Sequence, residues 1–199
     1  MRLLPSSADA VLEALDVLKN GGVIAHATET CYGLACDLKN PTAVKKLFAI
    51  KKRSTTQPVS ALFKNVEQAK DYTEWTTRAD ELAALHLPGP LTLILRMRTD
   101  APAKLYPIPD GTAESLGIRV SSNPLASQLA TFFGGPISTT SANVHGEENP
   151  YDAQSIFQRF SKEKQQPDLI LDSGTLPKVP PSTVMDLVNE GEIRRKGTI

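Results

Sequence analysis

Apolar positions along the chain follow a helical period in some segments and form short β-like runs in others. Near the start, apolar side chains recur every three or four residues. This spacing predicts an amphipathic helix over residues 8–20 that ends at Gly21-Gly22. The same spacing, with Asn40-Pro41 and Asn123-Pro124 as helix starts, predicts further helices. These lie near residues 41–50, 65–72, 76–87, 124–133 and 152–161.

Short runs rich in apolar residues separate these helices and predict strands. They lie at residues 23–27, 58–63, 91–95, 117–120, 136–139, 168–172, 182–188 and 192–195, with a turn at Glu190-Gly191 between the last two. Strands and helices alternate through most of the chain, which favours a single α/β domain over residues 1–199 with a substantially parallel or mixed sheet. The closing pair of strands adds antiparallel pairing. Residues 99–116 are irregular and proline-rich, as in a domain boundary or a loop over a site.

Composition excludes several classes of protein. The chain has 199 residues, of which 40% are hydrophobic and 22% charged, and its 22 basic residues balance 22 acidic ones. These fractions are typical of an ordinary folded protein, and the zero net charge argues against a polybasic nucleic-acid binder and against an acidic solvating chain. No apolar run approaches the roughly 20 residues that span a bilayer, and no signal peptide is visible. We therefore expect a cytoplasmic protein.

The cysteines, Cys31 and Cys36, are five positions apart. The residues between them are typical of a turn, and so short a segment does not favour a disulfide. Two cysteines and three scattered histidines make no zinc pattern. We expect buried or half-buried free thiols and predict no metal site in the chain itself.

Two polar segments adjoin apolar elements in the first third of the chain. Residues 28–33 (TETCYG) follow a buried strand, where hydroxyls and a carboxylate can hold a small polar substrate or simply cap a turn. In the second segment, five of the nine residues from 45 to 53 are basic. Such a cluster suits a polyphosphate, or it forms a solvated helix face.

Two more polar segments lie in the second half. Residues 138–143 (STTSAN) place consecutive hydroxyls after a strand, an arrangement that offers donors to anionic oxygens or forms a plain polar loop. Residues 181–186 and 193–197 combine hydroxyls with a basic cluster, which by itself is typical of an edge hairpin. Walker A, dinucleotide-binding and nucleophile-elbow motifs are missing from the sequence. The residues thus indicate a hydroxyl-rich, locally basic cleft for a nucleotide and a small polar molecule, without naming a reaction.

Taken in order, these segments resemble the YrdC family, the threonylcarbamoyl-AMP synthases. The resemblance runs from residue 21 to about 197 and is carried by residues 28–34, 50–53 with Pro58, 88–92, 117–120, 141–143, 182–184 and 193–195. Each motif is weak alone, but the ordered set is specific. The length resembles the short bacterial form, without the extra C-terminal domain of the longer form.

The resemblance implies a nucleotidyltransferase that forms threonylcarbamoyl-adenylate and pyrophosphate from L-threonine, bicarbonate and ATP with magnesium. The product feeds the N6-threonylcarbamoyladenosine modification of tRNA through a tRNA threonylcarbamoyl-transferase complex, with at most weak tRNA binding by the synthase. The implied fold is an α/β structure whose twisted, open mixed sheet has flanking helices and a concave, basic cleft.

The family motif also implies roles for individual residues. The threonine pocket would consist of Thr30, Arg119, Thr139 and Ser182. ATP would contact Lys51, Arg53, Gln57, Ser115, Ser141, Asn143, Asn149 and Arg195. Lys51, Arg53 and Arg119 would be the catalytic residues, because they face the charge that develops on phosphates and carboxylate.

The sequence departs from the family pattern at a few positions. Ala27 stands where proline is usual, Ser54 where proline is frequent, and Gln57 where lysine or asparagine is common. A missing lysine at position 57 would weaken phosphate binding, unless Lys52 or Lys46 compensates. These departures leave room for a paralogue with another acceptor. The alternative function is an RNA-binding or ribosome-maturation module that uses the same basic cleft without adenylate chemistry.

Overall fold

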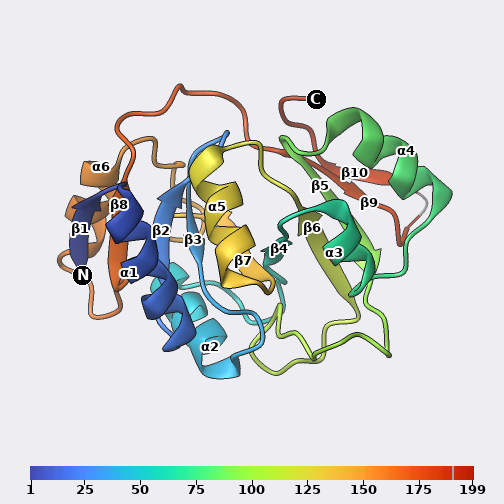
Figure 1. Ribbon diagram of the computed structural model, residues 1–199, viewed down its shortest axis with the longest axis horizontal. Coiled ribbons are helices and arrows are strands. Elements are labelled where there is room, and N and C mark those ends of the chain that lie inside the picture. Colours follow the sequence, from blue (N-terminus) through green and yellow to red (C-terminus); the bar gives the residue numbers. More distant parts are fainter. Residues whose placement is uncertain (190) are drawn as a thin grey trace.

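A single sheet runs through the molecule, and helices pack against it (Figure 1). The structure, a computed structural model, describes residues 1–189 and 191–199, so Glu190 of the predicted turn lies outside the described residues. In this part of the chain the strands are β1 (Arg2–Pro5), β2 (Ile24–Ala27), β3 (Tyr32–Ala35), β4 (Ser60–Leu62), β5 (Leu91–Arg96), β6 (Ser115–Arg119), β7 (Ile137–Ser141), β8 (Leu169–Asp172), β9 (Thr183–Asp186) and β10 (Glu192–Arg195). The helices are α1 (Ala8–Lys19), α2 (Pro41–Lys51), α3 (Val66–Lys70), α4 (Thr77–His86), α5 (Pro124–Phe133) and α6 (Ala153–Phe160).

The strand order across the sheet is β1-β8-β2-β3-β7-β4-β6-β5-β9-β10. Strand β8 pairs in parallel with β1 and β2, and the pairs β4–β6 and β5–β9 are also parallel. The other pairs, including β2–β3 and β9–β10, are antiparallel. The predicted mixed, open sheet with flanking helices is therefore confirmed.

Two strands differ from the sequence-based expectation. Strand β1 has no counterpart among the predicted elements, and residues 32–35 form β3 rather than a turn. Strand β3 is antiparallel to β2, so the polar residues 28–31 form the loop of a hairpin. This hairpin directs the loop to the edge of a large cleft.

Local signals set the helix boundaries as predicted. The Asn40 side chain accepts hydrogen bonds from the backbone N–H groups of Thr42 and Ala43 at the start of α2. Asn123 does the same at the start of α5, and Gly134, with φ +77°, ends that helix in the left-handed region. A proline at the first turn fixes φ for the helix and lacks an N–H that would be unpaired there.

Replacement of Asn123 by alanine is expected to lower the free energy of unfolding by about 1 kcal/mol, because two N–H groups at the start of α5 lose their acceptor. Urea denaturation measures this change. The exposed helical residue Gln154 is the control, since Gln154→Ala removes a solvated side chain and should change stability by less than about 0.5 kcal/mol. Equal stability of the two variants would contradict the capping role.

Apolar side chains from both faces of the sheet form the core. On one face, Ile24, Leu62, Ile137 and Leu169 pack with α1 and α5. On the other, residues such as Leu34, Leu93 and Ile118 form a second cluster with α2, α4 and α6. Residues two apart in a strand share a face. Because Ser60 and Thr139 line a cleft while Leu62 and Ile137 pack with α5, the cleft continues the face that α1 and α5 cover.

The irregular segment before β6 contains no helix or strand from Thr99 to Glu114. It is tied to the sheet region, since Val59 N donates to Pro107 O and Tyr106 N to Leu38 O. It does not lie over the large cleft but lines a separate cavity of about 230 Å³ with Tyr72 and Met97. Among the described residues, no helix has the length and apolar character needed to cross a membrane.

Candidate active site

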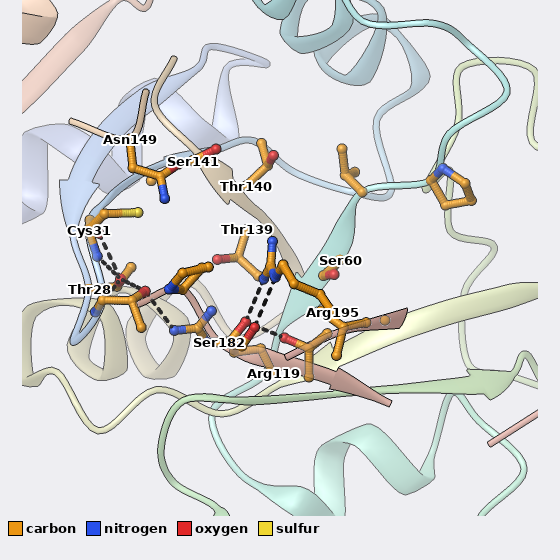
Figure 2. A pocket seen from close by; sticks show the side chains of 18 of the residues that line it. Thr28, Cys31, Ser60, Arg119, Thr139, Thr140, Ser141, Asn149, Ser182 and Arg195 are labelled. Atoms are coloured by element: carbon orange, nitrogen blue, oxygen red, sulfur yellow. Dashed lines mark hydrogen bonds between the residues drawn. The ribbon is translucent and has the colours of Figure 1, made fainter. Parts of the chain in front are cut away.

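A cleft of about 510 Å³ opens on the sheet face beyond α5, and its walls come from segments spread over residues 28–195. Figure 2 shows part of this lining, with Arg119, Thr139, Ser182 and Arg195 close together. The predicted site residues that line the cleft are Thr30, Lys51, Arg53, Ser115, Arg119, Thr139, Ser141, Asn143, Asn149, Ser182 and Arg195. The structure therefore brings together all of the predicted set except Gln57.

Strand alternation produces the polar floor of the cleft. Ser115, Gly117 and Arg119 of β6 face the cleft, whereas Leu116 and Ile118 between them belong to the core. A side chain at position 117 would crowd Ser60, because a Cβ atom there would lie 2.4 Å from Ser60 Oγ and 3.0 Å from Ser60 Cβ. The floor thus combines hydroxyls, a guanidinium and a bare stretch of backbone.

The β2–β3 hairpin loop is held by the hydroxyl of Thr28. This oxygen donates to Cys31 O at 2.7 Å and accepts from the N–H groups of Thr30 and Cys31. It also lies 3.1 Å from Thr30 Oγ1. The loop is therefore a preformed turn that presents the Thr30 hydroxyl, which is both a possible donor and an acceptor, to the cleft.

Arg119 sits at the end of β6 in a buried ion pair with Glu29. Its Nη2 donates to Glu29 Oε1 at 2.6 Å and to Thr30 Oγ1 at 3.1 Å, and Ser121 Oγ donates to the other carboxylate oxygen. Burial alone would raise the pKa of Glu29, but the Arg119 charge and these hydrogen bonds outweigh it and hold the pKa below its usual value. Glu29 does not line the cleft, contrary to the expectation that its carboxylate would grip a substrate there.

Arg195 and Ser182 line the cleft near Arg119 (Figure 2). Arg195 Nη2 donates to Ser182 Oγ at 2.9 Å and its Nε to Ser182 O at 3.0 Å. The Ser182 hydroxyl also shares a hydrogen bond of 3.0 Å with Thr92 Oγ1. Burial, followed by the nearby Arg119 charge, lowers the pKa of Arg195. Two guanidinium groups thus approach the same part of the cleft, which favours an anionic ligand there.

Lys51, in the last turn of α2, connects that helix to the loop after β7. Its Nζ donates to Ser141 O, Asn143 O and Asn143 Oδ1 at 2.5–3.1 Å, so protein oxygens take all three of its N–H donors. Burial, with a smaller effect of the Arg53 charge, lowers the pKa of Lys51 to about 7. Ser141 Oγ donates to the same Asn143 Oδ1 at 2.7 Å, which makes residues 141–143 one connected donor and acceptor set.

The pKa of Lys51 gives a testable pH dependence. Because the pKa is lowered to about 7, the ammonium charge is present below pH 7 and is lost as the pH rises through that value. The family resemblance places Lys51 at ATP, and on that expectation the affinity for ATP should fall as the pH rises from 6.5 to 8.5, by at most about tenfold per pH unit, because one proton is linked to binding. Titration calorimetry over this range measures the effect. Lys51→Arg keeps the charge and should flatten the profile, so an unchanged slope in that variant would exclude Lys51 as its source.

Arg53 follows α2, and its guanidinium donates to backbone oxygens of its own loop. Nε donates to Gln57 O and Nη2 to Pro58 O, both at 2.9 Å. Gln57 itself is exposed and outside the cleft lining, contrary to its predicted contact with ATP. The Ser54 hydroxyl lies 2.9 Å from Thr56 Oγ1 in the same exposed turn. The departures at positions 54 and 57 therefore lie beside the cleft rather than in it.

The basic cluster of residues 45–53 does not act as one surface. Lys46 Nζ pairs with Asp168 at 2.5 Å, and Lys52 Nζ pairs with Glu163 at 3.0 Å. Only the Lys51 and Arg53 side chains of this cluster line the cleft in the described structure. A helix turns about 100° per residue, so neighbouring lysines point in different directions. Neither Lys46 nor Lys52 is placed to replace a lysine at position 57.

Both cysteines are free and buried, as predicted. Burial raises the pKa of Cys31 and raises that of Cys36 to about 12, so both remain neutral thiols near neutral pH. Cys36 accepts a hydrogen bond from Ser138 Oγ at 3.5 Å in the core. Cys31 lines the cleft, but its raised pKa does not favour use as a nucleophile.

Sequence reasoning missed several lining residues. Ser60, Thr92, Thr140, His145 and Asp186 line the cleft without having been predicted as site residues. The signal available for Ser60 and Thr92 was alternation, because each lies between two apolar core residues: Ser60 between Val59 and Ala61, and Thr92 between Leu91 and Leu93. Asp186 is the single acidic residue of the lining among the described residues, and it is paired with Arg194 at 2.9 Å. The cleft lining is thus basic, with Lys51, Arg53, Arg119 and Arg195 as its cations.

Comparisons with known proteins identify the family. A model of the Sua5/YciO/YrdC family, described as telomere recombination, matches residues 16–197. Threonylcarbamoyl-AMP synthase of Klebsiella pneumoniae is 32% identical over 197 residues, which cover 98% of each chain. Threonylcarbamoyl-AMP synthase of Photorhabdus laumondii is 32% identical over 194 residues, covering 96% of this chain and 98% of that protein.

Solved structures share the fold. E. coli YciO superposes with a TM-score of 0.84 at 26% identity, over 99% of this chain and 94% of that one. P. abyssi Sua5 complexed with L-threonine gives a TM-score of 0.86 at 27% identity and covers 98% of this chain. The match spans only 56% of the P. abyssi chain, which is much longer. The chain belongs to the Sua5/YciO/YrdC family.

Proposed function

We propose that this protein is a threonylcarbamoyl-AMP synthase, which forms threonylcarbamoyl-adenylate and pyrophosphate from L-threonine, bicarbonate and ATP. The observation that carries this proposal is the single cleft in which two groups of side chains meet. Arg119, Thr30, Ser182 and Arg195 suit an amino acid with a carboxylate, and the loop around Lys51 suits a polyphosphate. Full-length similarity to curated synthases supports the same reaction.

The reaction needs positioning and charge stabilisation rather than a protein nucleophile. The amine of threonine adds to bicarbonate to give a carbamate, with loss of water. A carbamate oxygen then attacks the α-phosphorus of ATP, and the bond from that phosphorus to the β-phosphate bridging oxygen breaks to release pyrophosphate. Arg119 would hold the threonine carboxylate, while Lys51, Arg53 and the hydroxyl of Ser141 would face the charge on the phosphates.

Magnesium fits this cleft as an ion that arrives with ATP. Among the described residues, no group of three or more His, Cys, Asp or Glu side chains is placed to hold a metal. Asp186, which lines the cleft, already accepts hydrogen bonds from Asn189 and Arg194. The hydroxyls of the lining suit a hydrated magnesium ion held chiefly by substrate phosphates, where it would supply charge neutralisation.

The product would pass to the transferase complex that modifies tRNA. Two lysines of segment 45–53, Lys46 and Lys52, are paired with acidic residues and do not form a continuous basic surface with Lys51 and Arg53. This arrangement favours a synthase that releases its product over an RNA-binding module. A protein that releases a small activated intermediate does not itself need a broad basic surface.

Incubation of the protein with ATP, L-threonine, bicarbonate and magnesium tests the proposal. We expect pyrophosphate release that requires both threonine and bicarbonate, with threonylcarbamoyl-adenylate detected by mass spectrometry. Serine, valine and other amino acids tested in parallel would reveal another acceptor. Pyrophosphate release that is independent of any amino acid, or its complete absence while ATP still binds, would overturn the proposed function.

A further inference from the structure

The carboxylate of Glu29 lies behind the cleft wall and contacts Arg119 rather than open solvent. The side chains of Arg119 and Glu29 are only 9% and 14% exposed, so this ion pair is largely buried rather than on the surface. Glu29 is outside the cleft lining, whereas Arg119 is part of it. The side-chain contact that joins Glu29 to the cleft lining is therefore its ion pair with the guanidinium of Arg119.

The ion pair leaves a defined part of the guanidinium available. Both described hydrogen bonds of Arg119, to Glu29 and to Thr30, are made by Nη2. The buried Nε has no hydrogen-bond partner among the described residues. A buried N–H without a partner is costly, so the hydrogen bonding of this guanidinium is incomplete in the protein alone. The protein thus holds Arg119 by Nη2, whereas Nη1 makes no hydrogen bond among the described residues, is not among the buried atoms and is free for an acceptor in the cleft.

Glu29 is itself fixed from a third element. Its second oxygen accepts a hydrogen bond from Ser121 Oγ, and the same hydroxyl accepts one from Asn123 N at 3.1 Å. Asn123 caps α5. The carboxylate is therefore clamped between the hairpin loop, the end of β6 and the start of α5, which leaves it little freedom to follow a moving guanidinium.

We propose that Glu29 is a positioning residue that fixes Arg119 so that its free nitrogen Nη1 meets the carboxylate of the amino-acid substrate. Glu29 also supplies a counter-charge, because Arg119 lies close enough to Arg195 for the two cations to affect each other. This inference rests on the proposed function, since it takes the ligand to be an amino acid. The contribution belongs to recognition of the carboxylate and not to binding of ATP.

The test compares threonine with threoninamide, which lacks the carboxylate, in wild type and in Glu29→Gln. Glutamine keeps an acceptor for Nη2 but removes the charge. We expect the Kd for threonine to rise about tenfold in Glu29→Gln, in line with the loss of a charge-assisted contact. The Kd for threoninamide and for ATP should change less than about twofold, so the preference for threonine over its amide shrinks.

A matched control is Glu163→Gln, which removes an arginine partner at the surface, where Arg159 Nη1 donates to Glu163 at 2.7 Å. This variant should keep the wild-type Kd for both ligands. Equal weakening of threonine and threoninamide in Glu29→Gln would indicate general disruption and overturn the inference, as would an unchanged Kd for threonine. Failure of wild type to bind threonine at all would instead overturn the proposed function and the inference with it.

Discussion

Replacement of Arg119 by alanine should abolish the use of threonine while sparing ATP binding. We expect threonine-dependent pyrophosphate release to fall about 100-fold or more, because the substrate carboxylate loses its guanidinium partner in a desolvated site. The Kd for ATP should change less than about threefold, since the proposed phosphate site of Lys51 and residues 141–143 makes no hydrogen bond to Arg119 among the described residues. A pyrophosphate assay and calorimetry with an ATP analogue measure the two quantities.

Stability must be separated from recognition in this experiment. Arg119→Ala leaves the buried Glu29 carboxylate without its ion-pair partner, a change that costs about 3–5 kcal/mol. The double variant Arg119→Ala/Glu29→Gln removes the orphaned charge and should recover much of the stability without recovering threonine use. Wild-type turnover in either variant would refute the assigned role of Arg119.

Replacement of Lys51 by methionine should have the second large effect, on ATP. Methionine has a similar length but no donor, so Ser141 O, Asn143 O and Asn143 Oδ1 each lose the hydrogen bond from Lys51, and the proposed phosphate site loses a charge. We expect the Kd for ATP to rise about 100-fold, and binding of threonine alone to change little. Calorimetry with a non-hydrolysable ATP analogue gives both constants.

Lys52→Met is the matched control, because Lys52 is the next residue and pairs with Glu163 at 3.0 Å away from the cleft. That variant should bind ATP as wild type does. Equal losses in Lys51→Met and Lys52→Met would show that general basicity of the segment, rather than the contact of Lys51 with residues 141–143, determines ATP affinity. Circular dichroism verifies that both variants are folded.

The sequence predicted the alternating elements well where local signals were strong. Asn-Pro starts and glycine stops place α1, α2 and α5 within about two residues, because helix ends depend on neighbouring side chains. Strand β1 lacks such a signal, since its four residues become a strand only through pairing with β8, more than 160 residues away. Strand β3 was predicted as a turn because it contains Gly33, and glycine is common in turns but also occurs within buried strands.

The sequence predicted many of the residues that line the candidate site, but not which partners their side chains contact. The family resemblance named eleven of the residues that line the cleft, yet neither it nor the spacing gave a direction for the side chains of 45–53. Whether a lysine on α2 meets a phosphate or an aspartate depends on which element packs against each face of that helix. The same holds for Glu29, whose carboxylate turned out to face Arg119 because the hairpin loop ends beside β6 and α5.

The strand order also determines when this protein acquires its cleft during synthesis. Strand β1 pairs with β8 from Arg2↔Leu169 to Pro5↔Asp172, and β8 also completes the edge of β2. Neither β1 nor β2 can pair with β8 until most of the chain has left the ribosome. Because the loop that this pairing closes is so long, the pairing slows folding. Ser182 and Arg195 come later still, next to and within the last two strands. A nascent chain can therefore form its helices early, but it has no complete cleft until its final strands join the sheet.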